Sequence, residues 1–306
     1  MSAQSAKLAV TIGDPAGVGP DVISKWAATA PAELLRRVEV IAHPRFLETL
    51  PAEVGKRPVG SPDFVPTAGD PSAEGCRVAF DALEAAARGC IDGTYRAVTT
   101  APISKYQMRK IGFEFAGQTE FFAARWGGEP VMCFAGKELI VALTTWHEPL
   151  ATVAEHLDKP RISRAVEAAA ILARKLRFAK SPRIAVCGFN PHAGEDGLIG
   201  REEIEKIDPV LDSLRPTYPD LSRTLPPDTV FARMRRSEFD AIVAMYHDQA
   251  LAPLKTLEFD EAVNISMNLS HLRTSPDHGT GYSIAGRGLA DCSSFAHAVD
   301  LAFKLS

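Results

Sequence analysis

The stretch DAIVAMYHDQALAPLK (residues 240–255) begins as an apolar run of strand length and then becomes abruptly polar. Residues 240–246 are nearly continuous in apolar character, which is typical of a β-strand that is covered on both faces. His247, Asp248 and Lys255 follow within a few residues. The order of residues therefore predicts a buried strand with titratable side chains gathered just beyond its end.

The same kind of run recurs along the chain, at residues 7–12, 38–43, 96–101, 139–145, 183–189 and 262–269. Between these runs lie helical patterns, among them residues 72–89, 160–178 and 201–214. This alternation predicts an α/β fold with largely parallel sheets flanked by helices. Two proline-rich stretches are expected to be loops, and the second is a candidate hinge between lobes: residues 57–72 and 217–229.

Composition narrows the class of protein. The chain has 306 residues, 46% of them hydrophobic and 24% charged, which is enough for two lobes. A formal net charge of −4 gives no overall electrostatic reason to bind nucleic acid or an anionic membrane surface. The five cysteines are scattered without a CxxC pair, and no apolar stretch reaches membrane-spanning length. These features predict a soluble, cytoplasmic protein.

Three histidines follow three of the predicted strands: His147, His192 and His247. Ligands of open α/β sheets bind beyond the carboxyl ends of strands, so these are the positions to inspect. A single such histidine is most simply a half-buried, hydrogen-bonded residue. Three together are typical of a catalytic metal site with an open fourth position. Because the three lie 45 and 55 residues apart, only the fold can bring them together.

Two glycine-rich segments allow two interpretations each. Residues 11–23 (TIGDPAGVGPDVI) form either a nucleotide loop or a tight turn that shapes a cleft, and they lack the GxGxxG spacing. Residues 273–288 (RTSPDHGTGYSIAGRG) are either a loop that approaches a ligand closely or a connector before the last helix.

Lys255, Asn264 and Arg273 follow one another at intervals of nine residues. An ammonium group, an amide and a guanidinium fork suit phosphate or carboxylate. Taken alone, Lys255 and Arg273 are better interpreted as solvated surface charges than as ligand-binding residues. Asn264 lies inside an apolar run, where a buried amide needs partners.

Eight ordered blocks, spread over nearly the whole chain, closely resemble the 4-hydroxythreonine-4-phosphate dehydrogenase family of pyridoxal phosphate biosynthesis: TIGDPAGVGP, GQTEFF, TTWHEPL, GFNPHAGE, PPDTVF, AMYHDQALAPLK, VNISMNL and RTSPDHGT. The resemblance implies a two-lobed α/β fold like that of isocitrate and isopropylmalate dehydrogenases. We expect one lobe from residues 1–110 together with 235–306 on the cofactor side, and a middle lobe from 111–234 with the metal ligands and dimer contacts.

The resemblance also implies an oxidative decarboxylation of 4-phosphooxy-L-threonine with NAD or NADP and a divalent metal such as zinc, magnesium or cobalt. The expected assembly is a homodimer with a shared active site. Roles are implied for residues of this chain: metal binding by His147, His192 and His247; substrate binding by Gln118, Thr119, Lys255, Asn264 and Arg273; cofactor binding by His278, Gly279, Thr280 and Gly281.

This chain departs from the family pattern at two of these positions. Gln118 stands where members often carry histidine before Thr119, and glutamine neither titrates near neutral pH nor carries charge toward a phosphate. Gly281 stands where the wider group has alanine. Alternative activities are therefore oxidation of a phosphorylated sugar acid, such as threonate or erythronate 4-phosphate, and metal-dependent phosphate ester hydrolysis.

Two residues are candidates for moving protons. Asp248 adjoins His247, so it either orients that imidazole or acts as a base, and we favour orientation. Lys105, after the predicted strand at 96–101, is the second candidate for acid–base catalysis.

Overall fold

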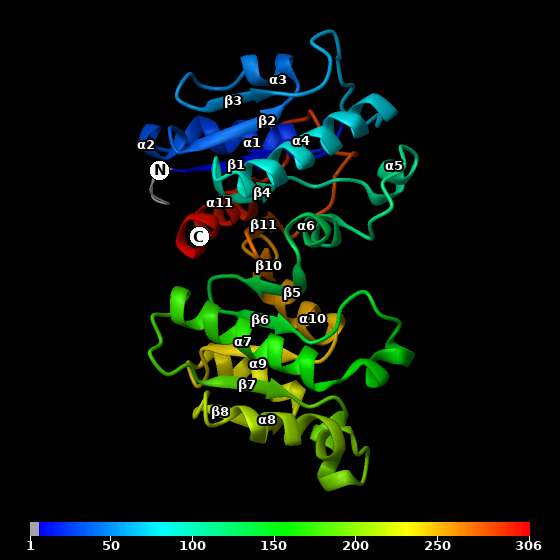
Figure 1. The fold of residues 1–306 in the computed structure, drawn as a ribbon, viewed down its shortest axis with the longest axis vertical. Coiled ribbons are helices and arrows are strands. Elements are labelled where there is room, and N and C mark those ends of the chain that lie inside the picture. Colours follow the sequence, from blue (N-terminus) through cyan, green and yellow to red (C-terminus); the bar gives the residue numbers. More distant parts are fainter. Residues whose placement is uncertain (1–5) are drawn as a thin grey trace. The chain divides into compact units, whose positions relative to one another are not determined.

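The computed structural model describes residues 6–306, which form two compact units (Figure 1). Unit 1 comprises residues up to Pro130 together with Leu269–Lys304 and Ser306, and unit 2 comprises Val131–Asn268 and Leu305. Residues 235–268 thus group with unit 2, whereas the expected boundaries assigned them to the lobe of the chain termini. Among residues 6–306, none of the helices is both long enough and apolar enough to cross a membrane.

In unit 1 the strand order is β3 (Gly55–Pro58), β2 (Val38–Ala42), β1 (Lys7–Thr11), β4 (Tyr95–Thr100) and β11 (Leu272–Pro276). The four neighbouring pairs in this order are all parallel. The helices of this unit are α1 (Gly19–Thr29), α2 (Ala32–Leu35), α3 (Pro44–Glu48), α4 (Ala73–Ile91), α5 (Lys105–Arg109), α6 (Gln118–Trp126) and α11 (Ser293–Leu305).

Alternate residues of β1 belong to two separate cores of unit 1. Leu8 and Val10 pack in a cluster with residues of α1 and α11, whereas Ala9 packs in a cluster with residues of α4 and α6. Successive side chains of a strand point to opposite faces, so the sheet is covered on both sides. Helix α4 begins where the Ser72 hydroxyl accepts a hydrogen bond from the Gly75 N–H at 3.0 Å.

In unit 2 the strand order is β10 (Val263–Leu269), β5 (Gly128–Ala135), β6 (Ile140–Leu143), β9 (Ala241–Ala244), β7 (Ile184–Cys187) and β8 (Leu221–Leu225). Strands β5 and β6 are antiparallel, while β9 pairs in parallel with both β6 and β7. The helical segments are the 3₁₀ segments η2 (Leu150–His156) and η3 (Pro191–Gly197), the π-helix η4 (Glu203–Ile207), and the α-helices α7 (Lys159–Leu176), α8 (Asp208–Leu214), α9 (Pro227–Arg235) and α10 (His247–Glu258).

The structure confirms the α/β class, the largely parallel sheets and each of the seven predicted strands. The prediction that residues 217–229 form only a loop is wrong, because they contain β8 and the first turn of α9. Residues 57–72 likewise include the end of β3, and residues 273–276 lie in β11. These strands are short, and the polar ones at the sheet edges lack the continuous apolar character of a central strand.

The glycines after β1 have structural roles. A Cβ at Gly19 would lie 2.1 Å from the Ile12 carbonyl oxygen, and one at Gly17 would lie 2.6 Å from the Thr280 carbonyl oxygen. Gly13 has φ +70°, which side-chain-bearing residues rarely adopt. The tight-turn interpretation of residues 11–23 therefore accounts for these glycines by itself.

His43, at the end of β2, is 3% exposed and lies among Phe46 and Phe64, with ring centroids 6.1 and 5.5 Å away. Its Nδ1 is buried without a hydrogen-bond partner among the described residues. Burial, and secondarily the charge of Arg45, lower the pKa of the His43 imidazole. The folded protein therefore holds this ring neutral under conditions in which an exposed histidine is protonated.

This burial predicts a pH dependence of stability. As pH falls below about 6.5, the unfolded chain binds a proton at His43 that the folded protein does not, so the free energy of unfolding decreases by up to about 1.4 kcal/mol per pH unit until the folded-state pKa is reached. In urea titrations between about pH 7.5 and 5.5, His43→Gln should weaken this decrease. His271→Gln, at a less buried ring whose pKa burial also lowers, is the matched control and should change it less. An unchanged slope in His43→Gln would contradict the prediction.

Candidate functional site

Two of the three predicted metal ligands lie beside each other in unit 2. The ring centroids of His147 and His247 are 6.0 Å apart. The reason is the parallel pairing of β6 with β9, which aligns Leu143 with Ala244 and so brings both strand ends to one edge. Beyond the strands, the backbone N–H and the hydroxyl of Thr145 both donate to the Met245 carbonyl oxygen, at 3.2 and 2.7 Å.

The two rings of this pair are close enough to reach a shared cation. A metal–nitrogen bond of about 2.0–2.1 Å puts an imidazole centroid roughly 3 Å from the ion, so two rings 6.0 Å apart can reach one ion. The Nδ1 atom of His247 lies 2.7 Å from Asp248 Oδ1, which leaves Nε2 for coordination. Asp248 is 86% exposed, so its carboxylate orients the ring from the solvent side.

His192 lies in η3, after the end of β7, which pairs in parallel with β9, and its side chain is exposed. In the part of the chain that the structure describes, no three His, Cys, Asp or Glu side chains gather as a metal-binding group. Within the described residues of one chain, His147 and His247 thus form a neighbouring pair that His192 does not complete as a three-residue group.

In unit 1, Arg273 on β11 is a buried guanidinium, 5% exposed. Its Nε and Nη2 donate to the Thr100 hydroxyl at 3.1 and 2.9 Å, and its Nη1 donates to the Thr119 hydroxyl at 3.4 Å. Burial lowers the pKa of Arg273 to about 10, and the charge of Glu120 opposes that shift. The guanidinium is therefore still charged at neutral pH, and a bound anion would stabilise it further.

Lys105, Gln118 and Thr119 lie near this guanidinium along the chain segments that follow β4. Gln118 and Thr119 open helix α6, and Gln118 Nε2 donates to the Ala101 carbonyl oxygen at 3.2 Å. Gln118 Oε1 is buried and has no hydrogen-bond partner within residues 6–306. Lys105 opens α5, and a Cβ placed on Gly117 would lie 3.6 Å from its Nζ, so the ammonium group borders the start of α6.

The remaining predicted substrate residues belong to unit 2. Lys255 lies on α10, with its Nζ 5.8 Å from the centroid of the Phe259 ring, and Asn264 lies on β10. Both side chains are half-buried, which matches neither a free surface charge nor a core residue. Thr119 and Lys255 thus lie on helices, α6 of unit 1 and α10 of unit 2, whereas Arg273 and Asn264 lie on strands of units 1 and 2.

The predicted cofactor loop packs on the first glycine-rich turn. The Val18 N–H donates to the Thr280 carbonyl oxygen at 2.8 Å, and a Cβ on Gly281 (φ +54°) would lie 2.8 Å from Val18 Cγ1. His278 Nδ1 lies 3.0 Å from the Gly279 carbonyl oxygen. Gly279 has no neighbouring atom within 4 Å of an added Cβ, so its surface is open to a ligand.

Two residues that the sequence did not single out fix this loop. The Tyr282 hydroxyl donates to Asp14 Oδ2 at 2.5 Å, and Asp14 Oδ1 accepts from the Ala16 N–H at 2.9 Å. Burial raises the pKa of the Tyr282 hydroxyl, and the bond to Asp14 adds to that shift. Asp14 is 2% exposed. Its position in the TIGDPAG segment, shortly after the end of a predicted strand, is the sequence feature that could have identified it.

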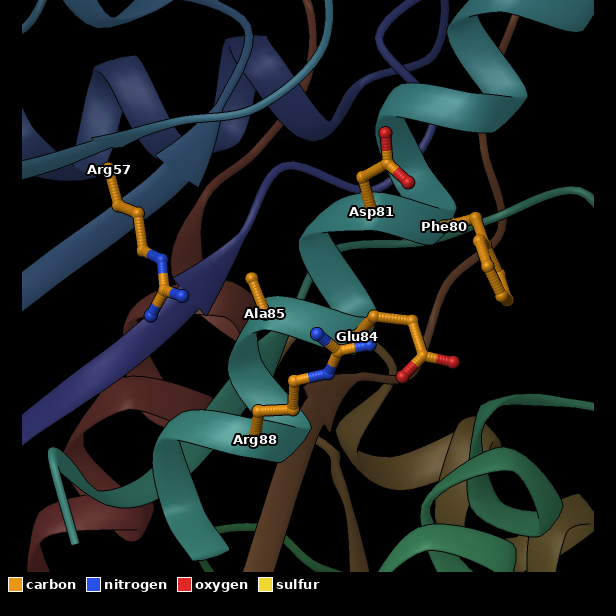
Figure 2. A pocket seen from close by; sticks show the side chains of 6 residues that line it. All are labelled: Arg57, Phe80, Asp81, Glu84, Ala85 and Arg88. Carbon is orange, nitrogen blue, oxygen red and sulfur yellow. The ribbon is translucent and has the colours of Figure 1, made fainter. Parts of the chain in front are cut away.

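A hollow of about 320 Å³ lies elsewhere on unit 1, between α4 and β3. Figure 2 shows its lining, which comprises Arg57, Phe80, Asp81, Glu84, Ala85 and Arg88. None of the predicted site residues is among them. Arg57 is already bonded to the Tyr95 hydroxyl at 3.1 Å, and Glu84 pairs with Arg125. This hollow is a mixed-charge surface feature separate from the groups described above.

Comparison with known proteins identifies the family. The family model "Pyridoxal phosphate biosynthetic protein PdxA" matches residues 20–302. The chain is 39% identical to the 4-hydroxythreonine-4-phosphate dehydrogenase of Beijerinckia indica subsp. indica, over 97% of this chain and 94% of that protein.

Solved structures agree. The crystal structure of 4-hydroxythreonine-4-phosphate dehydrogenase from Klebsiella pneumoniae matches with a TM-score of 0.84 and 32% identity, over 98% of this chain and 99% of that one. An isocitrate dehydrogenase from Methylococcus capsulatus matches with a TM-score of 0.53 and 14% identity, over 98% and 85% of the two chains, a likeness of fold alone. It confirms the isocitrate dehydrogenase-like architecture. The chain belongs to the PdxA family of pyridoxal phosphate biosynthetic proteins, with 4-hydroxythreonine-4-phosphate dehydrogenases as its relatives.

Proposed function

We propose that this chain is an NAD(P)-dependent dehydrogenase that oxidises and decarboxylates 4-phosphooxy-L-threonine to 3-amino-2-oxopropyl phosphate in pyridoxal phosphate biosynthesis. The observation that carries the proposal is the 39% identity to a 4-hydroxythreonine-4-phosphate dehydrogenase over nearly the full length of both proteins. Two features of the chain suit such a substrate: the buried guanidinium of Arg273 in unit 1, for an anionic group, and the neighbouring imidazoles of His147 and His247 in unit 2, for a metal ion. We place the enzyme in the cytoplasm.

Five residues would bind the substrate: Gln118, Thr119 and Arg273 of unit 1, and Lys255 and Asn264 of unit 2. Of these, Lys255, Asn264 and Arg273 are the groups suited to its phosphate. The hydroxyls of Thr100 and Thr119 hold Arg273 in place, so its planar guanidinium is oriented before an anion binds. Gln118 would contact a hydroxyl or amine of the substrate rather than its phosphate, because its buried Oε1 is an acceptor that needs a donor. Binding energy at the phosphate then positions the reacting carbon.

His147, His192 and His247 would hold a divalent cation such as zinc, magnesium or cobalt. His147 and His247 lie at a separation that suits one ion, and Asp248 leaves Nε2 of His247 available. We propose that a homodimer completes the set, because within one chain His192 does not gather with the other two as a metal-binding group among the described residues. His278, Gly279, Thr280 and Gly281 would lie against NAD or NADP, since Gly279 leaves backbone open.

When bound, the nicotinamide supplies the hydride acceptor, and the cation supplies positive charge beside the oxygen that becomes a carbonyl. The protein's own part is orientation and proton transfer. Asp248 fixes the tautomer and direction of His247. Lys105, whose ammonium group borders the start of α6 next to the substrate-binding residues, would hold or move a proton at the substrate.

Gln118 favours a second candidate activity at the same site, oxidation of a phosphorylated sugar acid such as threonate or erythronate 4-phosphate. A neutral amide in place of a histidine changes which charge and hydrogen bonds the substrate meets. Metal-dependent hydrolysis of the phosphate ester is the alternative from a different class.

The substrate assignment is tested by parallel assays of the purified protein reconstituted with Zn²⁺, Mg²⁺ or Co²⁺. NADH or NADPH should form with 4-phosphooxy-L-threonine, and little should form with 4-phosphothreonate. Reduction with 4-phosphothreonate alone would move the assignment to the sugar acid. Release of inorganic phosphate without nicotinamide would support the hydrolase.

Arg273→Lys tests the anion site. Lysine keeps a charge but loses the fork that bridges Thr100 and Thr119, and a charge-assisted hydrogen bond is worth about 1.5–3 kcal/mol. KM for the phosphorylated substrate should therefore rise roughly 10- to 100-fold, with little change in KM for the nicotinamide. Arg125→Lys, at an ion pair with Glu84, is the control and should leave both constants unchanged. An unchanged substrate KM in Arg273→Lys would argue against the role.

His247→Ala tests the metal site by metal content rather than by turnover. After dialysis the variant should bind the metal with less than about a tenth of the wild-type affinity and so lose most of its metal content, because it lacks one ligand together with the support that Asp248 gives that ligand. Its far-UV circular dichroism should be unchanged. His156→Ala, in the same unit and paired with Glu148, is the matched control and should keep full metal content. Full metal occupancy in His247→Ala would exclude the ligand role.

A further inference from the structure

We propose that Glu203 and Gln249 are positioning residues that hold the loop carrying His192 against the strand end carrying His247. The inference rests on the proposed metal site and deepens it. Neither residue is a candidate ligand, since the carboxylate and the amide are both occupied by other partners. Their partners are the backbone segments from which the two histidines project.

The first link is the side chain of Gln249, in the first turn of α10. Its Oε1 accepts from the Met245 N–H at 2.7 Å, and its Nε2 donates to the Gly188 carbonyl oxygen at 2.7 Å. Met245 directly follows β9 and Gly188 directly follows β7, whose parallel register pairs Val186 with Val243. Gln249 is 8% exposed, so its amide ties the two strand ends together just past the last residues of the strands.

The second link is Glu203, the first residue of the π-helix η4 and only 2% exposed. Its Oε1 accepts from the N–H groups of Phe189 and Asn190, both at 2.7 Å, and its Oε2 accepts from Asn190 Nδ2 at 2.9 Å. A buried carboxylate satisfied by three N–H donors makes strong, directional bonds. The donors belong to the segment that leads from β7 to His192.

The loop is shaped around this carboxylate. A Cβ on Gly194 (φ +79°) would lie 2.7 Å from Glu203 Oε2, and one on Gly188 would lie 3.1 Å from Oε1. Between these glycines, His192 and Ala193 have φ of 51° and 53°, in the left-handed region that side-chain-bearing residues rarely adopt. Such a conformation persists only where surrounding contacts determine it, and Glu203 binds Phe189 and Asn190 just before it and lies beside Gly194 just after it.

The two links act in series. Gln249 fixes Gly188 relative to Met245, and Glu203 fixes Phe189 and Asn190, the residues that separate Gly188 from η3. The direction in which His192 projects is thereby set by buried hydrogen bonds rather than by its own exposed ring. A metal ion would then meet imidazoles whose backbones are already ordered, and loss of such supporting partners typically weakens metal binding 10- to 100-fold.

The test uses Co²⁺ titrations of the full-length protein, followed by absorbance, with Glu203→Gln as the main variant. Glutamine has the same shape but replaces one acceptor oxygen by a donor that faces N–H groups, so the Kd for Co²⁺ should rise roughly 10- to 100-fold. Glu205→Gln is the matched control. It removes the same charge from the same π-helix at an exposed ion pair with Arg201, and it should bind Co²⁺ as the wild type does.

Hydrogen exchange without metal supplies an independent readout. The amides of Phe189 and Asn190 should exchange at least about tenfold faster in Glu203→Gln than in the wild type, while amides of β9 should not change. If Glu203→Gln does not fold, Gln249→Met gives the same test, because methionine keeps the volume and loses both hydrogen bonds. A change confined to the melting temperature, with Kd unaltered, would show a merely structural role and overturn the inference.

The outcomes separate this inference from the proposed function. Wild-type protein that binds no Co²⁺ would overturn the metal site and the positioning role with it. Wild-type binding together with an unchanged Kd in Glu203→Gln or Gln249→Met would overturn the positioning role alone. A weakened Kd in both variants, with Glu205→Gln unaffected, is the result that we expect.

Discussion

The parallel pairing of β9 with both of its neighbours, β6 and β7, is the constraint on which the chemistry of unit 2 depends. Parallel strands end at the same edge of a sheet, so the residues that follow them are brought together whatever their separation in the chain. His147 and His247 are 100 residues apart in sequence, yet their rings are 6.0 Å apart. The Thr145 and Gln249 side chains extend the pairing one residue beyond the strands, which makes the edge rigid where the histidines begin.

Buried charge is handled in a consistent way in both units. Arg273 donates to threonine hydroxyls and also experiences the charge of Glu120, and Glu203 accepts from N–H groups, so each buried charge has polar partners within the protein. Burying an ion without such partners would cost several kcal/mol, on the order of its lost hydration. Neutral hydroxyl and N–H groups stabilise a buried ion by hydrogen bonds but do not cancel its charge. Arg273 therefore keeps a positive charge for an anionic ligand, while Glu203 uses its charge to order a loop.

The two units carry different parts of the proposed reaction. Unit 1 holds the guanidinium, the start of α6 and the glycine-rich loop at 278–281, which is fastened to the first turn through Thr280 and Tyr282. Unit 2 holds the three histidines, with Lys255 and Asn264. The loop proposed for the nicotinamide and the buried guanidinium are thus features of unit 1, and the histidines proposed for the cation are features of unit 2.

The sequence by itself determined the α/β class, the seven apolar strands and the candidate residues, because continuous apolar runs and polar strand ends are local features of the chain. It did not reveal β3, β5, β8 or β11. Strands β3 and β8 are short and polar and lie at the sheet edges, and β11 is a short strand that contains Arg273. For β5, the apolar run at residues 131–135 was an available signal. Tertiary structure alone decided that Asp14 meets Tyr282, that Glu203 meets Phe189 and that residues 235–268 group with unit 2. Each of these depends on hydrogen bonds or packing between distant segments, and a buried polar side chain shows its partner only once the backbone around it is folded.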